Sequence, residues 1–278
     1  MSVDTTRAAV LPAAARRRPR LRVPVPLQGL LAVVVLLALL ELVTAVGLLS
    51  DRHFPLISDD LRTLVRQLGE SDFWTSVGQT LETWAIGFGI AAVLGVLLGI
   101  VVGASESLYS ATRVIIEFLR PIPSVALIPL AVLVYGTGVK SAVFLSAFAA
   151  TWPILVQAIY GVRDVDPVAL DTARAYGFGP FDRMRLVMFP SAVAYVVTGL
   201  RIASSTALIL VVTAELVIGA PGLGKAINLA QSGNDVELMY ALIIATGLLG
   251  WGLNTIFTTL ERRLLHWHPS QRAEEPTS

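Results

Sequence analysis

Long apolar runs separated by short polar segments dominate the hydropathy pattern of this chain. A helix needs roughly 20 mostly apolar residues to cross about 30 Å of hydrocarbon. Six runs meet or approach that length, and we expect each to be a membrane span. They lie near residues 27–49, 75–102, 121–136, 139–161, 191–218 and 238–259. The third run is short and contains Pro121, Pro123 and Pro129, so a kinked or partly broken span is expected there.

The composition supports a membrane protein and excludes several other classes. Hydrophobic residues make up 55% of the 278 residues and charged residues only 15%, against about 25% charged residues in ordinary globular proteins. A soluble enzyme and a disordered protein are therefore excluded. The chain has no cysteine, which excludes a disulfide scaffold and a cysteine nucleophile. The predicted fold is an all-α polytopic membrane protein with about six transmembrane helices.

Positive charges are distributed unevenly among the segments outside the spans. Fifteen Lys and Arg residues lie in the N-terminal tail, segments 103–120 and 162–190 and the C-terminal tail, against five in the alternating segments. Because Lys and Arg favour the cytoplasmic side, both termini are predicted to be cytoplasmic, in a multi-pass protein of the cell (inner) membrane. The predicted organisation is a basic tail over 1–26, a transmembrane domain over 27–260 and a cytoplasmic tail over 261–278. A cleaved signal peptide is the alternative for the first run, but its length and the spans that follow favour an uncleaved anchor.

The cytoplasmic segment between the fourth and fifth spans contains a short helix with clear signals at both ends. Asp166 followed by Pro167 is typical of a helix start, since the acid can cap the first turn and proline fits the first helical position. Gly177 and Gly179-Pro180 indicate where it ends. A helix of about ten residues is too short to be stable alone. It is suited to docking a partner, and packing on its own bundle is the alternative.

This segment resembles the EAA loop of ABC-importer permeases, in which Glu-Ala-Ala is followed at fixed spacings by Gly and by Leu-Pro. Residues 171–173 (Asp-Thr-Ala) take the place of the triplet, Gly177 follows at the family's spacing, and Phe189-Pro190 stands at the Leu-Pro position. In the family, this coupling helix seats in a cleft of the ATPase subunit. The resemblance therefore implies a set of ATPase-coupling residues: Asp166, Pro167, Asp171, Ala173, Arg174, Gly177 and Pro190.

Further motifs narrow the resemblance to the permeases of the sulfonate, taurine and nitrate group. They are Arg120-Pro-Ile-Pro-Ser124, Thr198-Gly-Leu-Arg201, and Glu215 with Gly222-Leu-Gly224. The resemblance covers about residues 50–268. It implies a permease subunit that imports a small anion, with vitamin precursors or aromatic acids as alternative solutes.

The resemblance also implies partners. They are ABC ATPase subunits that hold ATP and Mg, a soluble substrate-binding protein, membrane lipid and a second copy of the chain in a homodimer. Nucleic acid is not expected. The chain itself is expected to bind no cofactor and no metal, and to be no enzyme.

Residues 219–226 nearly match a phosphate-binding loop. Gly219 and Gly224-Lys225 fit the pattern, but Ala226 stands where a hydroxyl would hold Mg²⁺, and a membrane span precedes the loop instead of a strand. We therefore expect a tight turn that leads into a short surface helix at the outer mouth.

Ionisable residues within the apolar runs are expected to face the bundle interior or water, because each costs at least about 2.5–3.5 kcal/mol in mid-bilayer. Arg201 and Glu215 lie on one face of the fifth span, but about 21 Å apart along its axis, so they cannot pair in a straight helix. Snorkelling of these two charges to opposite membrane surfaces is the alternative to a functional face. The functional face is predicted to line the translocation path or the dimer interface through Thr198, Arg201, Ser205, Thr206 and Glu215.

A stripe of small residues in the second span, Gly95, Gly99 and Gly103, predicts close helix packing within the bundle.

Two rival functions remain. One is a secondary transporter that couples protons to a solute through Glu82, Arg201 and Glu215. The other is a membrane scaffold without a path. The docking helix and the absence of an evident inverted repeat disfavour the secondary transporter.

Overall fold

Helices form every regular element of the described chain, which comprises residues 25–48, 50 and 53–265 of a computed structural model. The predicted all-α fold is confirmed. The elements are α1 (Val25–Ala45), α2 (Ile57–Gln67), α3 (Ser71–Ala104), α4 (Glu106–Leu119), the 3₁₀ turn η1 (Ser124–Leu127), α5 (Ile128–Tyr135), α6 (Val139–Arg163), α7 (Pro167–Ala175), α8 (Pro180–Arg183), the π-helical turn η2 (Met184–Met188), α9 (Phe189–Ile218), α10 (Leu223–Ser232) and α11 (Val236–Leu264).

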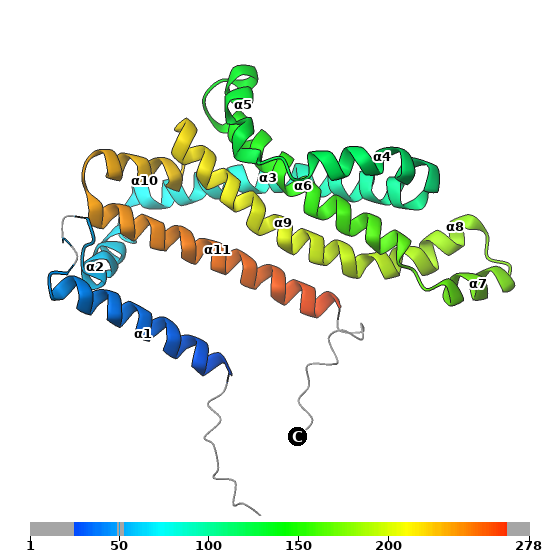
Figure 1. Cartoon of the computed structure of the whole chain (residues 1–278), viewed down its shortest axis with the longest axis horizontal. Helices are drawn as coiled ribbons and strands as arrows, with labels where there is room; N and C mark the ends of the chain where they lie inside the picture. The colour runs from blue at the N-terminus through cyan, green and yellow to red at the C-terminus, as the bar shows by residue number, and fades with distance from the viewer. Residues whose placement is uncertain (1–24, 49, 51–52, 266–278) are drawn as a thin grey trace, which may run out of the picture.

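Four helical segments are long and apolar enough to cross a membrane. They are α3, α6, α11 and the run Pro180–Ile218, in which α8, η2 and α9 follow one another. They coincide with the predicted spans at 75–102, 139–161, 191–218 and 238–259. The predicted span at 27–49 falls on α1, which is apolar over Leu31–Ala45. Figure 1 shows α3, α6, α9 and α11 extending along the long axis of the molecule.

The third predicted span, 121–136, differs from the expected single kinked helix. The helix within that range, α5, has only 8 residues. Together, α4 and the segment Ser124–Tyr135 are apolar enough to cross a membrane, but they meet at an angle of 85°. Pro121 and Pro123 lie at this break. The helix is interrupted there because proline lacks the N–H that would continue it. By length and composition, the described chain therefore has four membrane-crossing helices, or five if the bent pair is one span.

Small residues allow α3 to lie directly against α6. A Cβ added at Gly95 would lie 2.7 Å from the Ile154 Cβ, and one added at Gly99 would lie 2.5 Å from the Ala158 Cβ. Both distances are shorter than real Cβ contacts, so only glycine fits without a shift. The predicted packing of this stripe within the bundle is confirmed.

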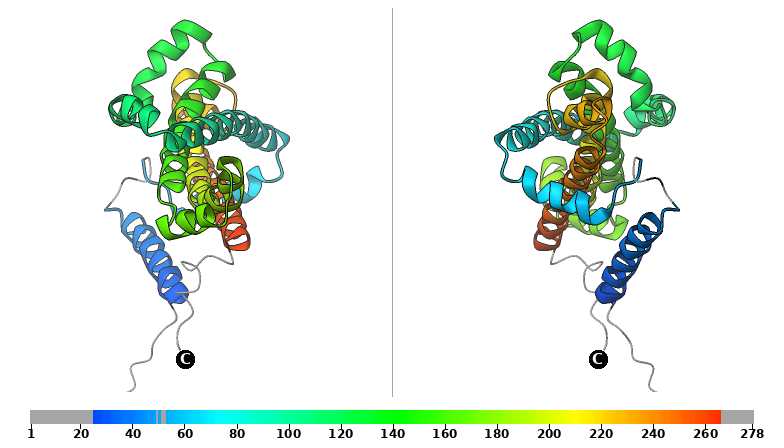
Figure 2. Two further views of the ribbon diagram at one scale, coloured as in Figure 1. Left: turned by 90° about the vertical axis from the view of Figure 1, so that its right-hand side faces the viewer. Right: turned by 90° about the vertical axis from the view of Figure 1, so that its left-hand side faces the viewer.

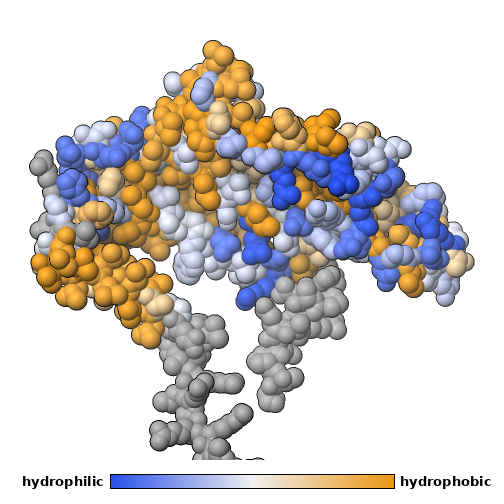
Figure 3. All heavy atoms as spheres, in the orientation of Figure 1, coloured by the Kyte–Doolittle hydropathy of each residue, from blue (hydrophilic) through white to orange (hydrophobic). Residues whose placement is uncertain are grey.

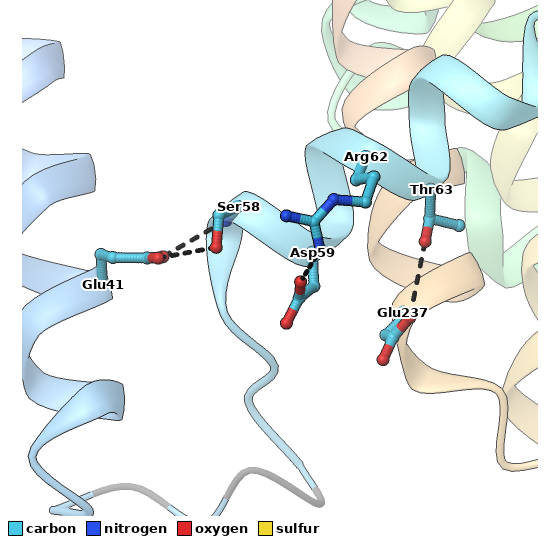
Figure 4. A network of polar contacts seen from close by, with 6 residues as sticks. All are labelled: Glu41, Ser58, Asp59, Arg62, Thr63 and Glu237. Carbon is cyan, nitrogen blue, oxygen red and sulfur yellow. Dashed lines mark hydrogen bonds and ion pairs between the residues drawn. The ribbon is translucent and has the colours of Figure 1, made fainter.

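The first helix stands apart from the bundle. Both views of Figure 2 show α1 separated from the other long helices, and its described side chains between residues 31 and 40 are all exposed. Its contact with the rest of the chain runs through α2, where Glu41 accepts hydrogen bonds from the Ser58 N–H at 3.3 Å and the Ser58 hydroxyl at 2.8 Å (Figure 4). Figure 3 shows apolar surface over α1 and over the protruding α5. Both helices therefore offer faces to lipid or to another chain.

Acidic residues gather where α2 meets α11. The Thr63 hydroxyl donates a hydrogen bond to Glu237 at 3.5 Å (Figure 4). Asp60 lies in α2, outside the spans, is only 4% exposed, and has one carboxyl oxygen without a hydrogen-bond partner. Burial raises the pKa of Asp60 to about 6, and the negative charges of Glu237, Asp59 and Glu41 contribute to the same rise. This carboxyl group therefore binds its proton more tightly in the folded chain than in the unfolded one.

Candidate docking helix and solute cavity

The short helix α7 begins and ends at the residues that the sequence predicts. The Asp166 side chain accepts a hydrogen bond from the Val168 N–H at 2.8 Å, and Pro167 occupies the first helical position. At the other end, Gly177 has a φ of +77°, and the Phe178 N–H donates to the Ala173 carbonyl at 3.0 Å. This is the usual way in which a left-handed glycine closes a helix. Both ends of α7 are therefore fixed by local chemistry.

The outer surface of α7 and α8 carries exposed apolar side chains. Val168, Tyr176 and Phe181 are 70%, 79% and 74% exposed. Ala173 is buried, and α7 packs on α8 and η2. This surface, which we call the α7–α8 hairpin surface, lies at the end of the molecule opposite α10 (Figure 1). Large apolar groups held so far from the bundle core are typical of a site where another protein binds.

Two more of the predicted coupling residues form an ion pair on α7. Arg174 Nη1 lies 2.7 Å from Asp171 Oδ1, and both side chains are well exposed. Exposed pairs at this spacing on a helix contribute little to stability. Both side chains are therefore available to a partner.

A π-helical turn joins the hairpin to α9. The Phe189 N–H donates to the Met184 carbonyl, five residues earlier, as a π-helix requires. Pro190 follows directly and has no N–H to donate. Such turns inside α-helices occur frequently at functional sites. The helical run over Pro180–Ile218, 39 residues long, therefore links the docking end of the molecule to its other end.

At that other end, Glu215 is completely buried beneath α10. Its carboxyl group accepts hydrogen bonds from the Thr80 hydroxyl at 3.0 Å and from the Gly224 N–H at 2.9 Å. The Thr80 oxygen in turn accepts from the Leu223 N–H at 2.9 Å. A Cβ at Gly222 would lie 2.1 Å from a Glu215 carboxyl oxygen, so the glycine motif closes directly over this acid. Glu215 thus holds the start of α10 in place.

The helix α10 differs from the surface helix that the sequence predicts. Leu223, Ile227 and Ala230 are buried, and α10 packs against α3, α9 and α11. The predicted tight turn is confirmed by Gly219, which has a φ of +80°. The two amides at the start of α10 already donate to Glu215 and to the side chain of Thr80, so they are not free to bind a phosphate.

Arg201 belongs to a separate network near the middle of α9. Its Nε lies 2.8 Å from a carboxyl oxygen of Glu261 in α11, although the N–H is not aligned for a hydrogen bond. The Thr198 hydroxyl donates to the other carboxyl oxygen at 2.8 Å. Arg201 and Glu215 therefore do not pair with each other, as their separation along the helix predicts. Sequence analysis missed Glu261, which lies 63 residues from Thr198.

A cavity of about 330 Å³ lies where the junction of α4 and η1 meets α6 and α9. This volume is in the range of small-molecule sites. Of the five predicted path residues, Thr206 lines the cavity. The structure does not gather the other four there: Thr198 and Arg201 bind Glu261, Glu215 is sealed beneath α10, and Ser205 is half-buried on α9.

Known proteins resemble this chain in sequence and in fold. Residues 91–266 match the family model described as "Binding-protein-dependent transport system inner membrane component". One relative is the nitrate import permease protein NrtB of Leptolyngbya laminosa, which is 30% identical over 69% of each chain. Another is the taurine transport system permease protein TauC of Escherichia coli (strain K12), 28% identical over 91% of this chain and 94% of the relative.

Solved structures show the same fold at lower identity. A chain from a structure titled "Crystal structure of an amino acid ABC transporter with histidines" has a TM-score of 0.60 and is 19% identical, covering 72% of this chain and 97% of the other. A chain of the MetNI methionine ABC transporter in an inward-facing conformation has a TM-score of 0.55 and is 22% identical, covering 69% and 93%.

Proposed function

Because the chain belongs to the family of inner-membrane components of binding-protein-dependent transport systems, we propose that it is the permease subunit through which an ABC importer moves a small anion into the cell. Sulfonates, taurine and nitrate are the favoured solutes, since relatives named for nitrate, aliphatic sulfonates and taurine match most of the chain. Energy comes from ATP, hydrolysed with Mg on a separate subunit.

The observation that carries this proposal is the α7–α8 hairpin surface. It presents exposed Val168 and Tyr176 at the two ends of the capped helix α7 and exposed Phe181 on α8. The hairpin leads through η2 into a long membrane helix. A partner that moves α7 therefore moves the end of α9. ATPase subunits bind here in our proposal, and their closure on ATP switches the membrane helices between inward-open and outward-open arrangements.

The proposal also fixes the orientation and the assembly. The end that carries α7 and α8 faces the cytoplasm. The start of α1 and the end of α11 both point toward that side (Figure 1), which supports cytoplasmic termini. Two copies of the chain enclose one path, and a soluble binding protein delivers the solute at the end that carries α10.

ATP-dependent uptake in proteoliposomes tests the proposal. The permease is reconstituted with its ATPase and binding protein as wild type, Gly177→Asp or Gly177→Asn. Both substituents have open space around them, and Asn is tolerated in the left-handed conformation that position 177 requires. We expect Gly177→Asp to abolish ATPase association and uptake, because it introduces an unpaired charge into a buried contact. The uncharged and similarly shaped Asn variant should retain both in part.

Two results would overturn this function. Uptake that persists in Gly177→Asp removes the docking role of the hairpin. Uptake by the permease alone, driven by a proton gradient, assigns the chain to the secondary transporters. Uptake of a vitamin precursor or an aromatic acid in place of sulfonates, taurine or nitrate would keep the importer and change its solute.

A further inference from the structure

The cavity between the α4–η1 junction, α6 and α9 is lined by hydrogen-bond donors and apolar walls. Its polar side chains are Arg120, Ser124, Trp152, Gln157 and Thr206, and no acidic side chain is among the described residues that line it. A positive charge surrounded by neutral donors and apolar walls favours an anion over a cation.

Arg120 differs from two neighbouring arginines, Arg113 and Arg163, which are both paired. Arg113 on the same helix pairs with Glu117 at 2.8 Å, and Arg163 pairs with Glu106 at 2.7 Å. Within the described ranges, the guanidinium of Arg120 has neither an ion pair nor a hydrogen bond. An arginine side chain has five N–H donors in a planar fork that fits the oxygens of an oxyanion. The cavity therefore contains a cation with its donors free.

Trp152 supplies the second observation. Its indole lines the cavity, and its Nε1–H is buried without a hydrogen-bond partner. Buried donors in proteins are nearly always paired, so an unpaired one needs an explanation. By contrast, the hydroxyl of Thr206 already donates to the Ile202 carbonyl at 3.1 Å. The donors left for a ligand are those of Arg120, Ser124, Trp152 and Gln157.

The break in the third span explains how these groups come together. Arg120 directly follows the last residue of α4, and Ser124 begins η1 four residues later, on the other side of the two prolines. The 85° bend between the two segments lets this junction cover the groove between α6 and α9. The Arg-Pro-Ile-Pro-Ser motif thus has a structural role in closing the cavity.

We propose that this cavity is the intramembrane binding site for the transported solute, and that it takes a small oxyanion of the sulfonate or nitrate class. Arg120 supplies the charge, and Trp152, Gln157 and Ser124 donate neutral hydrogen bonds to the remaining oxygens. This inference rests on the proposed function and adds the position and the recognition chemistry of the solute.

Anion binding to the purified permease–ATPase complex, without the binding protein, tests the site. Methanesulfonate and nitrate are titrated by calorimetry into wild type, Arg120→Gln and Trp152→Phe, with tetramethylammonium as the cationic probe. Arg113→Gln is the matched control, because it removes a charge from the same helix at a residue that does not line this cavity. Nanodiscs of phosphatidylcholine and of phosphatidylglycerol distinguish a dissolved anion from a lipid headgroup.

We expect saturable binding of both anions and none of the cation. Arg120→Gln should weaken binding by about tenfold to a hundredfold, as loss of a charged hydrogen bond implies. Trp152→Phe should weaken it by about threefold to tenfold, as loss of a neutral hydrogen bond implies, and Arg113→Gln should leave it unchanged. The affinity should be the same in both lipids.

Equal affinity in wild type and Arg120→Gln overturns the site, as does an equal loss in Arg113→Gln. A tenfold weaker affinity in phosphatidylglycerol shows that a lipid headgroup occupies the cavity instead. Failure of the proposed function is a separate result. If the cavity binds anions through Arg120 but uptake needs no ATPase, the importer assignment falls and the site stands. If uptake needs the ATPase but no anion binds to the complex, the site alone falls.

Discussion

Replacement of Thr80 by valine tests whether the buried carboxyl group of Glu215 holds α10 in place. Valine has nearly the shape of threonine but lacks the hydroxyl. The change removes the 3.0 Å hydrogen bond to Glu215 and the 2.9 Å bond from the Leu223 N–H. Because Thr80 is 0% exposed, water cannot replace either bond.

The expected loss of stability follows from one buried amide left without a partner and one hydrogen bond lost from a carboxyl oxygen that keeps another. A buried polar group without its hydrogen bond costs about 1–3 kcal/mol. The Leu223 N–H is left without an acceptor, whereas Glu215 Oε2 loses one of its two hydrogen bonds and keeps the one from the Gly224 N–H. With about 1 kcal/mol more for the hydrogen bond that the Glu215 oxygen loses, we expect Thr80→Val to cost about 2–4 kcal/mol. At roughly 2–4 °C per kcal/mol for a chain of this size, the midpoint of thermal unfolding should fall by roughly 4–16 °C.

Thermal unfolding in nanodiscs, followed by tryptophan fluorescence, measures this loss. Thr80→Ser keeps the hydroxyl and should stay close to wild type. Thr83→Val is the matched control, because Thr83 is another buried threonine on α3, and the described residues offer its side chain no hydrogen bond. An unfolding midpoint for Thr80→Val within about 2 °C of both controls would refute the reasoning, since the hydroxyl would then carry no stability.

Two further predictions concern packing and pH. Gly99→Ala should destabilise the protein by about 1–3 kcal/mol, because its new Cβ would lie 2.5 Å from that of Ala158. Gly89→Ala, on the same helix with open space, should gain up to about 1 kcal/mol from helix propensity. Equal midpoints for the two variants would contradict the close contact of α3 with α6. For Asp60, whose folded-state pKa is raised to about 6, the stability from its protonated form is present below about pH 4 and lost as the pH rises through about 6. Wild type should therefore gain stability relative to Asp60→Asn when the pH falls from 7 to 5, and a constant difference between the two would contradict the burial of this acid.

Features set by neighbouring residues could be predicted from the sequence. The ends of α7 depend on Asp166, Pro167 and Gly177, which act within one or two turns of the helix that they delimit. The four long helices follow from apolar runs that each exceed the thickness of a membrane. In both cases the information is contiguous along the chain, so no knowledge of the folded arrangement is needed.

Partnerships between distant residues could not be predicted in this way. Thr80 and Glu215 are 135 residues apart, and nothing in the local pattern around Thr80 distinguishes it from Thr83. Glu261 precedes Arg262 and Arg263 at the end of the last span, and this local pattern predicts only one of several charges at the membrane interface. Its pairing with Arg201 depends on how α9 crosses α11.

Two local sequence signals predict the helix α4. The positive charges of Arg113 and Arg120 predict that segment 103–120 is a cytoplasmic connection, but they do not indicate its secondary structure. Ser105 accepts a hydrogen bond from the Leu108 N–H at 3.4 Å, so it is a helix cap of the kind that serine commonly forms. Arg113 and Glu117 form a pair at the four-residue spacing of a helix. Together, these two signals indicate a helix.

The π-helical turn before Pro190 has a consequence for how the coupling end of this protein can vary. A π turn contains one residue more than the α-helix around it, and one residue corresponds to about 100° of rotation. The extra residue in Met184–Met188 therefore sets the azimuth at which the hairpin leaves the axis of α9. A helical wheel that advances residues 180–218 by a constant angle of about 100° per residue therefore places the side chains of α8 on the wrong side of the helix axis. Loss of one residue from this turn would preserve an unbroken helix and yet rotate Tyr176 and Phe181 to another side of it. The length of this segment, as much as its composition, therefore determines which way the docking surface points.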